Sequence, residues 1–320
     1  EEFAKEVKVV MEERRMRTED NPQALTREQF YATAFISNPY RNPVVGWMDD
    51  LESMDVADLR TWYQRWYAPN NAVVVVVGDV EPQAVLALAK KYFEPLEPSE
   101  ILPVKPRTEA SQLGEKRILV KAPAKLPYLL MGYHAPVLKF ADEPWEPYAL
   151  EVLAGVLDGG NSARLAKELV RGKEIAAGAS VGYSMIGLHN DLFSLSGTPT
   201  EAHSIETLEA EFLAQIEILK QTLVDESELA RVKAQVVASN VYELDSVFYQ
   251  AMQIGMLETI GLGWPLLDEY VDNVRAVTAE QVQAVARKFL VKDQLTVAVL
   301  EPVATELDIE PSHHAGGLVH

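Results

Sequence analysis

Apolar and polar positions recur with two periods along the chain, and these periods predict helices and strands in turn. In the first region, helices are predicted at residues 3–19, 23–35, 59–67 and 82–92. A loop is predicted at residues 38–46 and a strand at residues 72–77. Asp55 is a favourable N-cap ahead of the third helix. Every residue from 72 to 77 is apolar and most are β-branched, which predicts a buried strand. The region is therefore expected to form an α/β layer.

Prolines are frequent in the next stretch, residues 96–113, which we interpret as a linker between two domains. Strands are predicted beyond it at residues 116–121, 126–135, 177–183, 191–198 and 294–300. Helices are predicted at residues 145–157, 162–171, 205–223, 226–260 and 278–290, the last opened by the capping box Thr278-x-x-Gln281. The expected domains are residues 1–95 and 114–302, with residues 303–320 as a polar tail.

The two regions share one pattern of elements. Residues 51–75 show a helix N-cap, an amphipathic helix, a helix break and a strand, in that order. The same order recurs over residues 274–298, although few residues are identical. We expect an α+β fold of two related α/β sandwich domains, each a mostly antiparallel sheet covered by helices. The chain starts at Glu1 within a predicted helix, with neither Met nor a signal-peptide pattern. The first domain is therefore expected to be truncated at its N-terminus.

The net charge of −19 excludes some classes of function. An acidic surface repels phosphates, which argues against binding to nucleic acid or to an anionic membrane and weakly favours cationic substrates. No apolar run is long enough to span a bilayer, since such a helix needs about 20 residues. The chain has no cysteine, so disulfides and thiolate metal sites are excluded.

The histidines, which are common zinc ligands, do not form a metal-binding motif. None of the six stands in H-x-x-x-H or H-x-x-E-H, so no helix of this chain presents two imidazoles to one metal ion. We interpret His134 as a packed or capping residue, and His313 and His314 as part of the tail. The nucleophile motif G-x-S-x-G is absent. The Gly159-Gly160 turn lacks the lysine of a phosphate-binding loop and is interpreted as a tight turn.

Two carboxylates, Glu6 and Glu13, are a further candidate for chemistry. Their spacing is nearly two helical turns, which places both on one face of the first predicted helix. From the residues alone, such a pair is most often a solvated charged stripe. Only the similarity of the surrounding sequence to a known family gives the pair a functional interpretation.

Four blocks of the chain resemble the insulinase/pitrilysin-type zinc peptidases, peptidase family M16. Residues 6–14, EVKVVMEER, are similar to the helix that supplies this family's third zinc ligand. Residues 38–46, NPYRNPVVG, resemble its H-P-Y-x-x-P-x-x-G loop, although Asn38 replaces a histidine that is not a zinc ligand. Residues 58–71, with D-L-x-x-W-Y-x-x-W-Y-A-P-N-N, together with the predicted strand and Gly78-Asp79-Val80 that follow, form its most recognisable block. Residues 157–165, LDGGNSARL, resemble its glycine-rich turn.

The resemblance implies that Glu13 is a zinc ligand and that Glu6 supports this ligand. In the family, the other two ligands are the histidines of H-x-x-E-H, whose glutamate is the general base, and this chain lacks that segment. The resemblance thus implies part of a zinc metalloendopeptidase subunit for peptides or unfolded polypeptides, with residues 1–320 inactive by themselves. A non-catalytic partner or structural subunit is the alternative within the family. Outside it, a small-molecule-binding α/β module has no motif in its favour.

The resemblance also bears on substrate contacts and partners. Many members carry an arginine after the glycine-rich turn and a tyrosine further on, and this pair holds the substrate from the half opposite the zinc. Arg171 matches the arginine, but Gly178 stands at the tyrosine position and offers no phenol. This implies a homo- or heterodimer in which a paralogue supplies the Arg/Tyr pair and this chain is the zinc-bearing partner. A bacterial periplasmic location is the family-level expectation.

Overall fold

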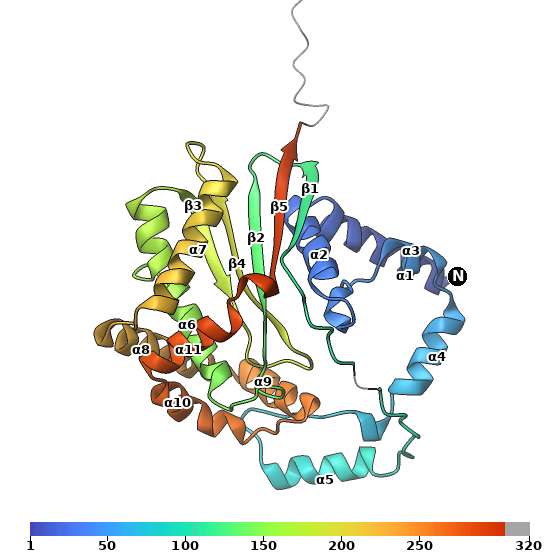
Figure 1. The fold of residues 1–320 in the computed structure, drawn as a ribbon. Coiled ribbons are helices and arrows are strands. Elements are labelled where there is room, and N and C mark those ends of the chain that lie inside the picture. Colours follow the sequence, from blue (N-terminus) through green and yellow to red (C-terminus); the bar gives the residue numbers. More distant parts are fainter. Residues whose placement is uncertain (106, 305–320) are drawn as a thin grey trace, which may run out of the picture.

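The computed structural model describes residues 1–105 and 107–304, and one five-stranded sheet lies at its centre (Figure 1). The strands are β1 (Lys116–Pro123), β2 (Tyr128–Ala135), β3 (Ala176–Gly182), β4 (Asp191–Pro199) and β5 (Leu295–Val303). Their order across the sheet is β1-β5-β2-β4-β3. β1 and β5 run parallel, and every other neighbouring pair is antiparallel. The expected mostly antiparallel sheet is confirmed, and all of its strands come from the second region.

Helices on one face of this sheet bury the larger core. They are α6 (Glu146–Asp158), α7 (Ile205–Gln221) and α11 (Ala279–Phe289), with α8 (Glu226–Glu243) packed on α6, and Figure 1 shows them away from the N-terminus. Leu129, Met131 and Tyr133 alternate along β2 and are fully or almost fully buried against these helices. Leu150 and Leu153 of α6 belong to the same core. Their spacing of one helical turn gives α6 its apolar face.

The opposite face of the sheet is covered by α2 (Pro22–Ala34), which attaches the first region to the second. Phe30 of α2 is fully buried in a smaller cluster with Leu130 of β2 and Leu300 of β5. A Cβ atom at Gly132 of β2 would lie 2.6 Å from the Cζ atom of Phe30. The missing side chain at Gly132 therefore lets the phenyl ring approach the strand closely.

The strand predicted for residues 72–77 is wrong. These residues belong to no strand, and Val73, Val74 and Val76 are 50%, 63% and 49% exposed. They lie between α4 (Val56–Trp66) and α5 (Pro82–Phe93). A strand forms only where a second strand pairs with its backbone, and no described segment pairs with this one. The division into a first domain, 1–95, a linker, 96–113, and a second domain, 114–302, stays a prediction.

A second correction concerns the long helix predicted for residues 226–260. The structure has two helices instead, α8 and α9 (Val247–Ile260), and the side chain of Ser246 caps the second by accepting from the Tyr249 backbone N–H. A further helix, α10 (Leu266–Ala276), follows a turn at Gly261 and was not predicted. The segment predicted as a helix at 162–171 is π-helical over Leu165–Gly172. Residues of α8, α9 and α10 line one cavity.

Two sequence predictions concern the ends of the chain and the membrane. The tail predicted for 303–320 starts within β5, and residues 305–320, with His313 and His314, lie outside the described residues. Within the described ranges, no helix is both long and apolar enough to cross a bilayer.

Candidate functional site

Glu6 and Glu13 lie on α1 (Glu2–Arg14), whose C-terminal end is fixed by the next residue, Arg14. The Arg14 guanidinium is buried and donates two hydrogen bonds to the Glu28 carboxylate of α2, at 2.8 and 2.9 Å. It also donates to the carbonyl oxygen of Gly46 at 2.7 Å. A bidentate arginine–carboxylate pair fixes both distance and orientation. The backbone that carries Glu13 is therefore held against α2 and the 38–46 loop.

The described residues do not by themselves fit a zinc ion. Glu13 is partly exposed and one of its carboxylate oxygens lies 3.1 Å from the Arg17 guanidinium, while Glu6 is exposed. Within residues 1–105 and 107–304, no three or more His, Cys, Asp or Glu side chains come together as a metal site. A catalytic zinc normally has three protein ligands. The metal-binding role of Glu13 and the supporting role of Glu6 stay predictions.

His134 is packed, as the sequence interpretation expected. Its ring lies edge-on to that of Phe35, with centroids 5.2 Å apart, and burial lowers its pKa. His189 makes a similar edge contact with Tyr40 at 5.5 Å. Neither histidine faces a cluster of other metal-binding side chains among the residues that the structure describes. Both are best assigned to packing.

The 38–46 loop docks on the second region through two side chains. Asn38 is buried and its amide donates to the carbonyl oxygen of Asn190 at 2.7 Å. The hydroxyl oxygen of Tyr40 accepts from the backbone N–H of Leu188 at 3.0 Å. Asn38 also caps the following turn by accepting from the Tyr40 N–H. The residue that departs from the family pattern thus has a structural role, as a link to the loop before β4.

Sequence reasoning missed the carboxylate that secures this loop, Glu109 in the predicted linker. Its two oxygens accept from the backbone N–H groups of Ile36, Ser37 and Asn38 at 2.7, 2.9 and 2.6 Å. Burial raises the pKa of Glu109, but these three N–H donors and the Ser37 hydroxyl outweigh it and hold the pKa below its ordinary value. A single acidic residue in a proline-rich stretch carries no pattern that predicts such a contact.

Replacing Glu109 by alanine should lower the free energy of unfolding by about 1–3 kcal/mol, because three N–H donors lose a charged acceptor. Since folding lowers the pKa of this carboxyl, its contribution is present at neutral pH and is lost as the pH falls through the folded-state pKa. Urea denaturation at several pH values measures this. Glu100→Ala, at an exposed linker position, is the matched control. Equal effects of the two substitutions at pH 7 would contradict the assignment.

The residues aligned with the family's substrate contacts lie beside the glycine-rich turn. The Arg171 guanidinium donates to the carbonyl oxygen of Asn161 within that turn, and the Asp158 carboxylate accepts from the Val181 N–H of β3 at 3.0 Å. Gly178 is exposed on β3, and a Cβ added there would meet nothing within 4 Å. The packing therefore leaves room for a larger side chain at Gly178. The substrate role of Arg171 stays a prediction.

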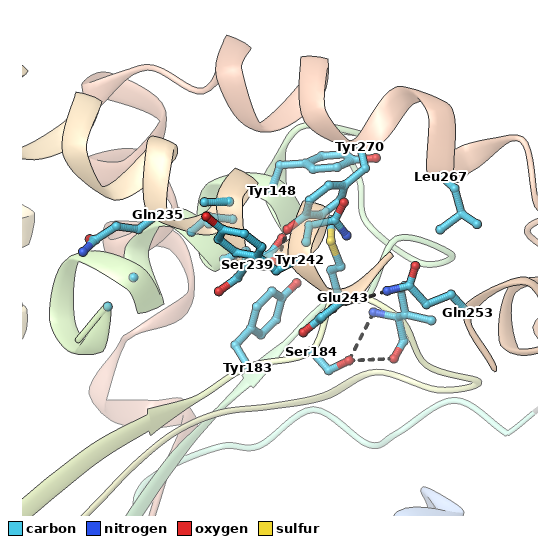
Figure 2. Close-up of a pocket in the computed structure, with 18 of the residues that line it drawn as sticks. Tyr148, Tyr183, Ser184, Gln235, Ser239, Tyr242, Glu243, Gln253, Leu267 and Tyr270 are labelled. Atoms are coloured by element: carbon cyan, nitrogen blue, oxygen red, sulfur yellow. Dashed lines mark hydrogen bonds between the residues drawn. The ribbon is translucent and has the colours of Figure 1, made fainter. Parts of the chain in front are cut away.

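A cavity of about 720 Å³ opens next to the same turn (Figure 2). Asp158, Gly159 and Gly160 line it together with residues of α6, α8, α9, α10 and the loop that follows β3. Glu151 of α6 is its most perturbed acid, since burial raises the pKa of this carboxyl to about 7. The lone glutamate within the apolar run 148–157 was the sequence signal for such a buried acid. Of the four blocks that resemble the metallopeptidase family, only the glycine-rich turn contributes residues to this cavity.

The described residues thus form a helix-covered, mostly antiparallel sheet of the α+β class. The sequence profile described as peptidase M16 inactive domain matches residues 53–236, more than half of the chain. The chain therefore belongs to the peptidase M16 family.

Two relatives with curated names are called zinc proteases. The zinc protease PqqE of Helicobacter pylori is 33% identical over 249 residues, which cover 77% of this chain and 55% of the relative. The uncharacterized zinc protease Rv2782c of Mycobacterium tuberculosis is 28% identical over 301 residues, which cover 92% of this chain and 66% of the relative. The chain thus spans roughly half to two thirds of the length of these relatives.

Solved structures show the same fold. A protease from Helicobacter pylori superposes with a TM-score of 0.87 at 28% identity, over 94% of this chain and 72% of that chain. A peptidase M16 inactive domain from Pseudomonas fluorescens superposes with a TM-score of 0.81 at 21% identity, over 95% of this chain and 71% of that chain. The α+β arrangement predicted from the sequence is confirmed by these neighbours.

Proposed function

We propose that the chain is part of a zinc metalloendopeptidase subunit that hydrolyses peptides or unfolded polypeptides, and that residues 1–320 alone are inactive. Membership of the M16 family and the zinc-protease names of its relatives support this. The observation that carries the proposal is the placement of Glu13 on a helix locked by Arg14 and Glu28. A metal ligand needs such a fixed backbone, because ligand positions must hold to within about 0.5 Å.

In this proposal, Glu13 is one ligand and Glu6 supports it from the same helix. Two histidines and a general base would come from another segment of a longer protein, since the described residues offer no complete set. The run of residues 72–77 is in keeping with a longer protein, because an added strand would pair with the backbone of this β-branched segment. The length of the relatives also supports a longer protein, because the match to PqqE covers only 55% of that relative.

The proposed partner is a second subunit of the same family that carries the Arg/Tyr pair, which a second copy of this chain would not supply. Arg171 is present here, but Gly178 leaves open space where the tyrosine would stand. The substrate contact opposite the zinc would then depend on the paralogue. A bacterial periplasmic location is part of this proposal on family grounds alone.

The dimer proposal is tested with the longer protein and a quenched fluorescent peptide. We expect hydrolysis when the longer protein is mixed with its paralogue and little hydrolysis by either protein alone. Gly178→Tyr should raise the activity of the longer protein without the paralogue, because the open position accepts a phenol. Gly178→Ala is the matched control and should not raise the peptidase activity. Full activity of the unmodified longer protein without a paralogue would contradict the two-subunit proposal.

The second candidate is a non-catalytic or structural subunit of the M16 family. The matching profile is itself described as an inactive domain, and the described residues hold no complete metal site. Under this alternative, Glu6 and Glu13 are surface charges and their replacement by glutamine changes neither metal content nor activity. The two candidates therefore differ in the consequence of one substitution, Glu13→Gln.

A further inference from the structure

The cavity of about 720 Å³ between α6, α8, α9 and α10 has an acidic and aromatic wall (Figure 2). Its acidic lining residues are Glu151, Asp158 and Glu243, and the described lining contains no lysine, arginine or histidine. Five tyrosines also line it, Tyr148, Tyr183, Tyr242, Tyr249 and Tyr270. The faces of tyrosine rings attract cations electrostatically. The composition of the wall favours a positively charged ligand over an anionic one.

Two residues that line this cavity each carry a buried acceptor atom that has no hydrogen-bond partner among the described residues. The Tyr270 hydroxyl donates to Oε1 of Glu151 at 2.8 Å, but Oε2 of the same carboxylate is buried and unpaired. The Gln253 amide nitrogen lies 3.4 Å from the Glu243 carboxylate, and Oε1 of Gln253 is buried and unpaired. A buried acceptor without a hydrogen bond destabilises the folded state. Both atoms are acceptors, so a ligand that satisfies them must donate N–H or O–H groups.

The charge state of Glu151 is set by groups on every wall of the cavity. Burial raises its pKa to about 7; the Tyr270 hydrogen bond opposes this, and the Glu243 carboxylate adds to it. Burial also raises the pKa values of Tyr148, Tyr183 and Tyr270, so these phenols remain neutral near pH 7. Asp158, whose pKa burial raises as well, accepts a hydrogen bond from Val181. Because no described lining residue is a cation, a bound cation would be the counter-charge of Glu151.

We propose that this cavity binds an alkylammonium or guanidinium group, with Oε2 of Glu151 and Oε1 of Gln253 accepting its N–H bonds and tyrosine rings enclosing its apolar stem. Three methionines in the wall, Met185, Met252 and Met256, supply adaptable apolar contacts for that stem. The ligand chemistry is that of a lysine or arginine side chain, or of a free aliphatic amine. The inference depends on the cavity alone and stands whether or not the longer protein is a peptidase.

Methionine methyl groups give a direct report on binding. The chain has 8 methionines, and three of them line the cavity. In the 320-residue chain labelled at the methionine methyls, Nα-acetyl-lysine methylamide should shift the signals of Met185, Met252 and Met256 and leave the other methionine signals unchanged. The norleucine analogue, which has the same stem without the ammonium group, is the matched ligand control and should shift nothing at the same concentration.

Affinity for the lysine derivative should rise about tenfold from pH 6 to pH 8, because the attracting charge of Glu151 appears as its proton leaves near pH 7. Glu151→Gln should weaken binding at least tenfold and remove this pH dependence. Gln253→Leu is a second variant that removes the other acceptor without a change of charge, and it should weaken binding several-fold. Glu226→Gln, at an exposed position of α8, is the charge-matched control and should leave the affinity unchanged.

Two further probes separate the sources of the cation. Cadaverine represents a free amine, and a capped Gly-Gly-Lys-Gly-Gly peptide represents a side chain within a polypeptide. Tighter binding of either one supports the cavity site and assigns its source. Unshifted methionine signals with every cationic probe would overturn the proposal, and so would equal binding of the norleucine analogue or full affinity in both Glu151→Gln and Gln253→Leu. Peptidase assays play no part, so failure here is distinct from failure of the proposed function.

Discussion

Phe30→Ala is expected to lower the free energy of unfolding by about 3–5 kcal/mol, measured by urea denaturation. Phe30 is fully buried and anchors α2 to the sheet through Leu130 and Leu300. Truncation of its ring removes apolar burial and leaves a cavity in the smaller core. Phe140, which is 48% exposed, is the matched control, and Phe140→Ala should change stability by less than about 0.5 kcal/mol.

The partner of Phe30 in this packing is Gly132, and the two substitutions should not be additive. A Cβ at Gly132 would lie 2.6 Å from the Phe30 ring, so Gly132→Ala alone should cost about 1–3 kcal/mol through overpacking. In the Phe30→Ala background, the methyl group has room and the cost should largely disappear. Additive losses in the double variant would contradict the close approach of α2 to β2.

Glu13→Gln in the longer protein is expected to reduce peptidase activity by more than the roughly 10–100-fold typical for residues that only support a metal ligand. The reason is that a neutral amide replaces a charged oxygen ligand on a fixed helix. Glu12→Gln is the matched control, because Glu12 neighbours Glu13, is exposed and forms an ion pair with Arg15 at 3.0 Å. Glu6→Gln should reduce peptidase activity by about 10–100-fold, less than Glu13→Gln and more than Glu12→Gln.

Equal activity of the Glu13→Gln and Glu12→Gln variants would contradict the assignment of Glu13. The chain would then be a structural subunit, and the acidic stripe on α1 would be the solvated face that composition alone suggests. Loss of activity from unfolding is separated by stability measurements, since Glu13 makes one partly exposed ion pair with Arg17. Such pairs contribute about 0–1 kcal/mol, so the variant should remain folded.

Local sequence signals predicted many elements of this fold correctly. The N-cap predicted at Asp55 and the capping box predicted at Thr278 both form, and each shows both reciprocal hydrogen bonds of a capping box. The strands from Lys116 onward also form, because each finds a neighbour within the same region. Asp245-Ser246 is an N-cap signal inside a long run of residues with helical apolar periodicity. The signal is only two residues long, and yet α8 ends and α9 begins there.

The failures of prediction have a common physical cause, which is dependence on distant partners. Residues 72–77 have strand composition, but pairing is non-local and no described segment provides it. The roles of Glu109 and Asn38 likewise depend on contacts with residues 71 to 152 positions away. For the site, resemblance selected Glu13, Glu6 and Arg171, whereas the cavity around Glu151 became visible only when four helices were placed around it.

The most direct test of the central proposal is the zinc content of the longer protein, measured by elemental mass spectrometry beside Glu13→Gln and Glu12→Gln. The proposal predicts about one zinc ion per chain in the unmodified protein and in Glu12→Gln, and almost none in Glu13→Gln. Absence of zinc from the unmodified protein, or full zinc content in Glu13→Gln, would contradict it and leave this chain as a structural member of the M16 family.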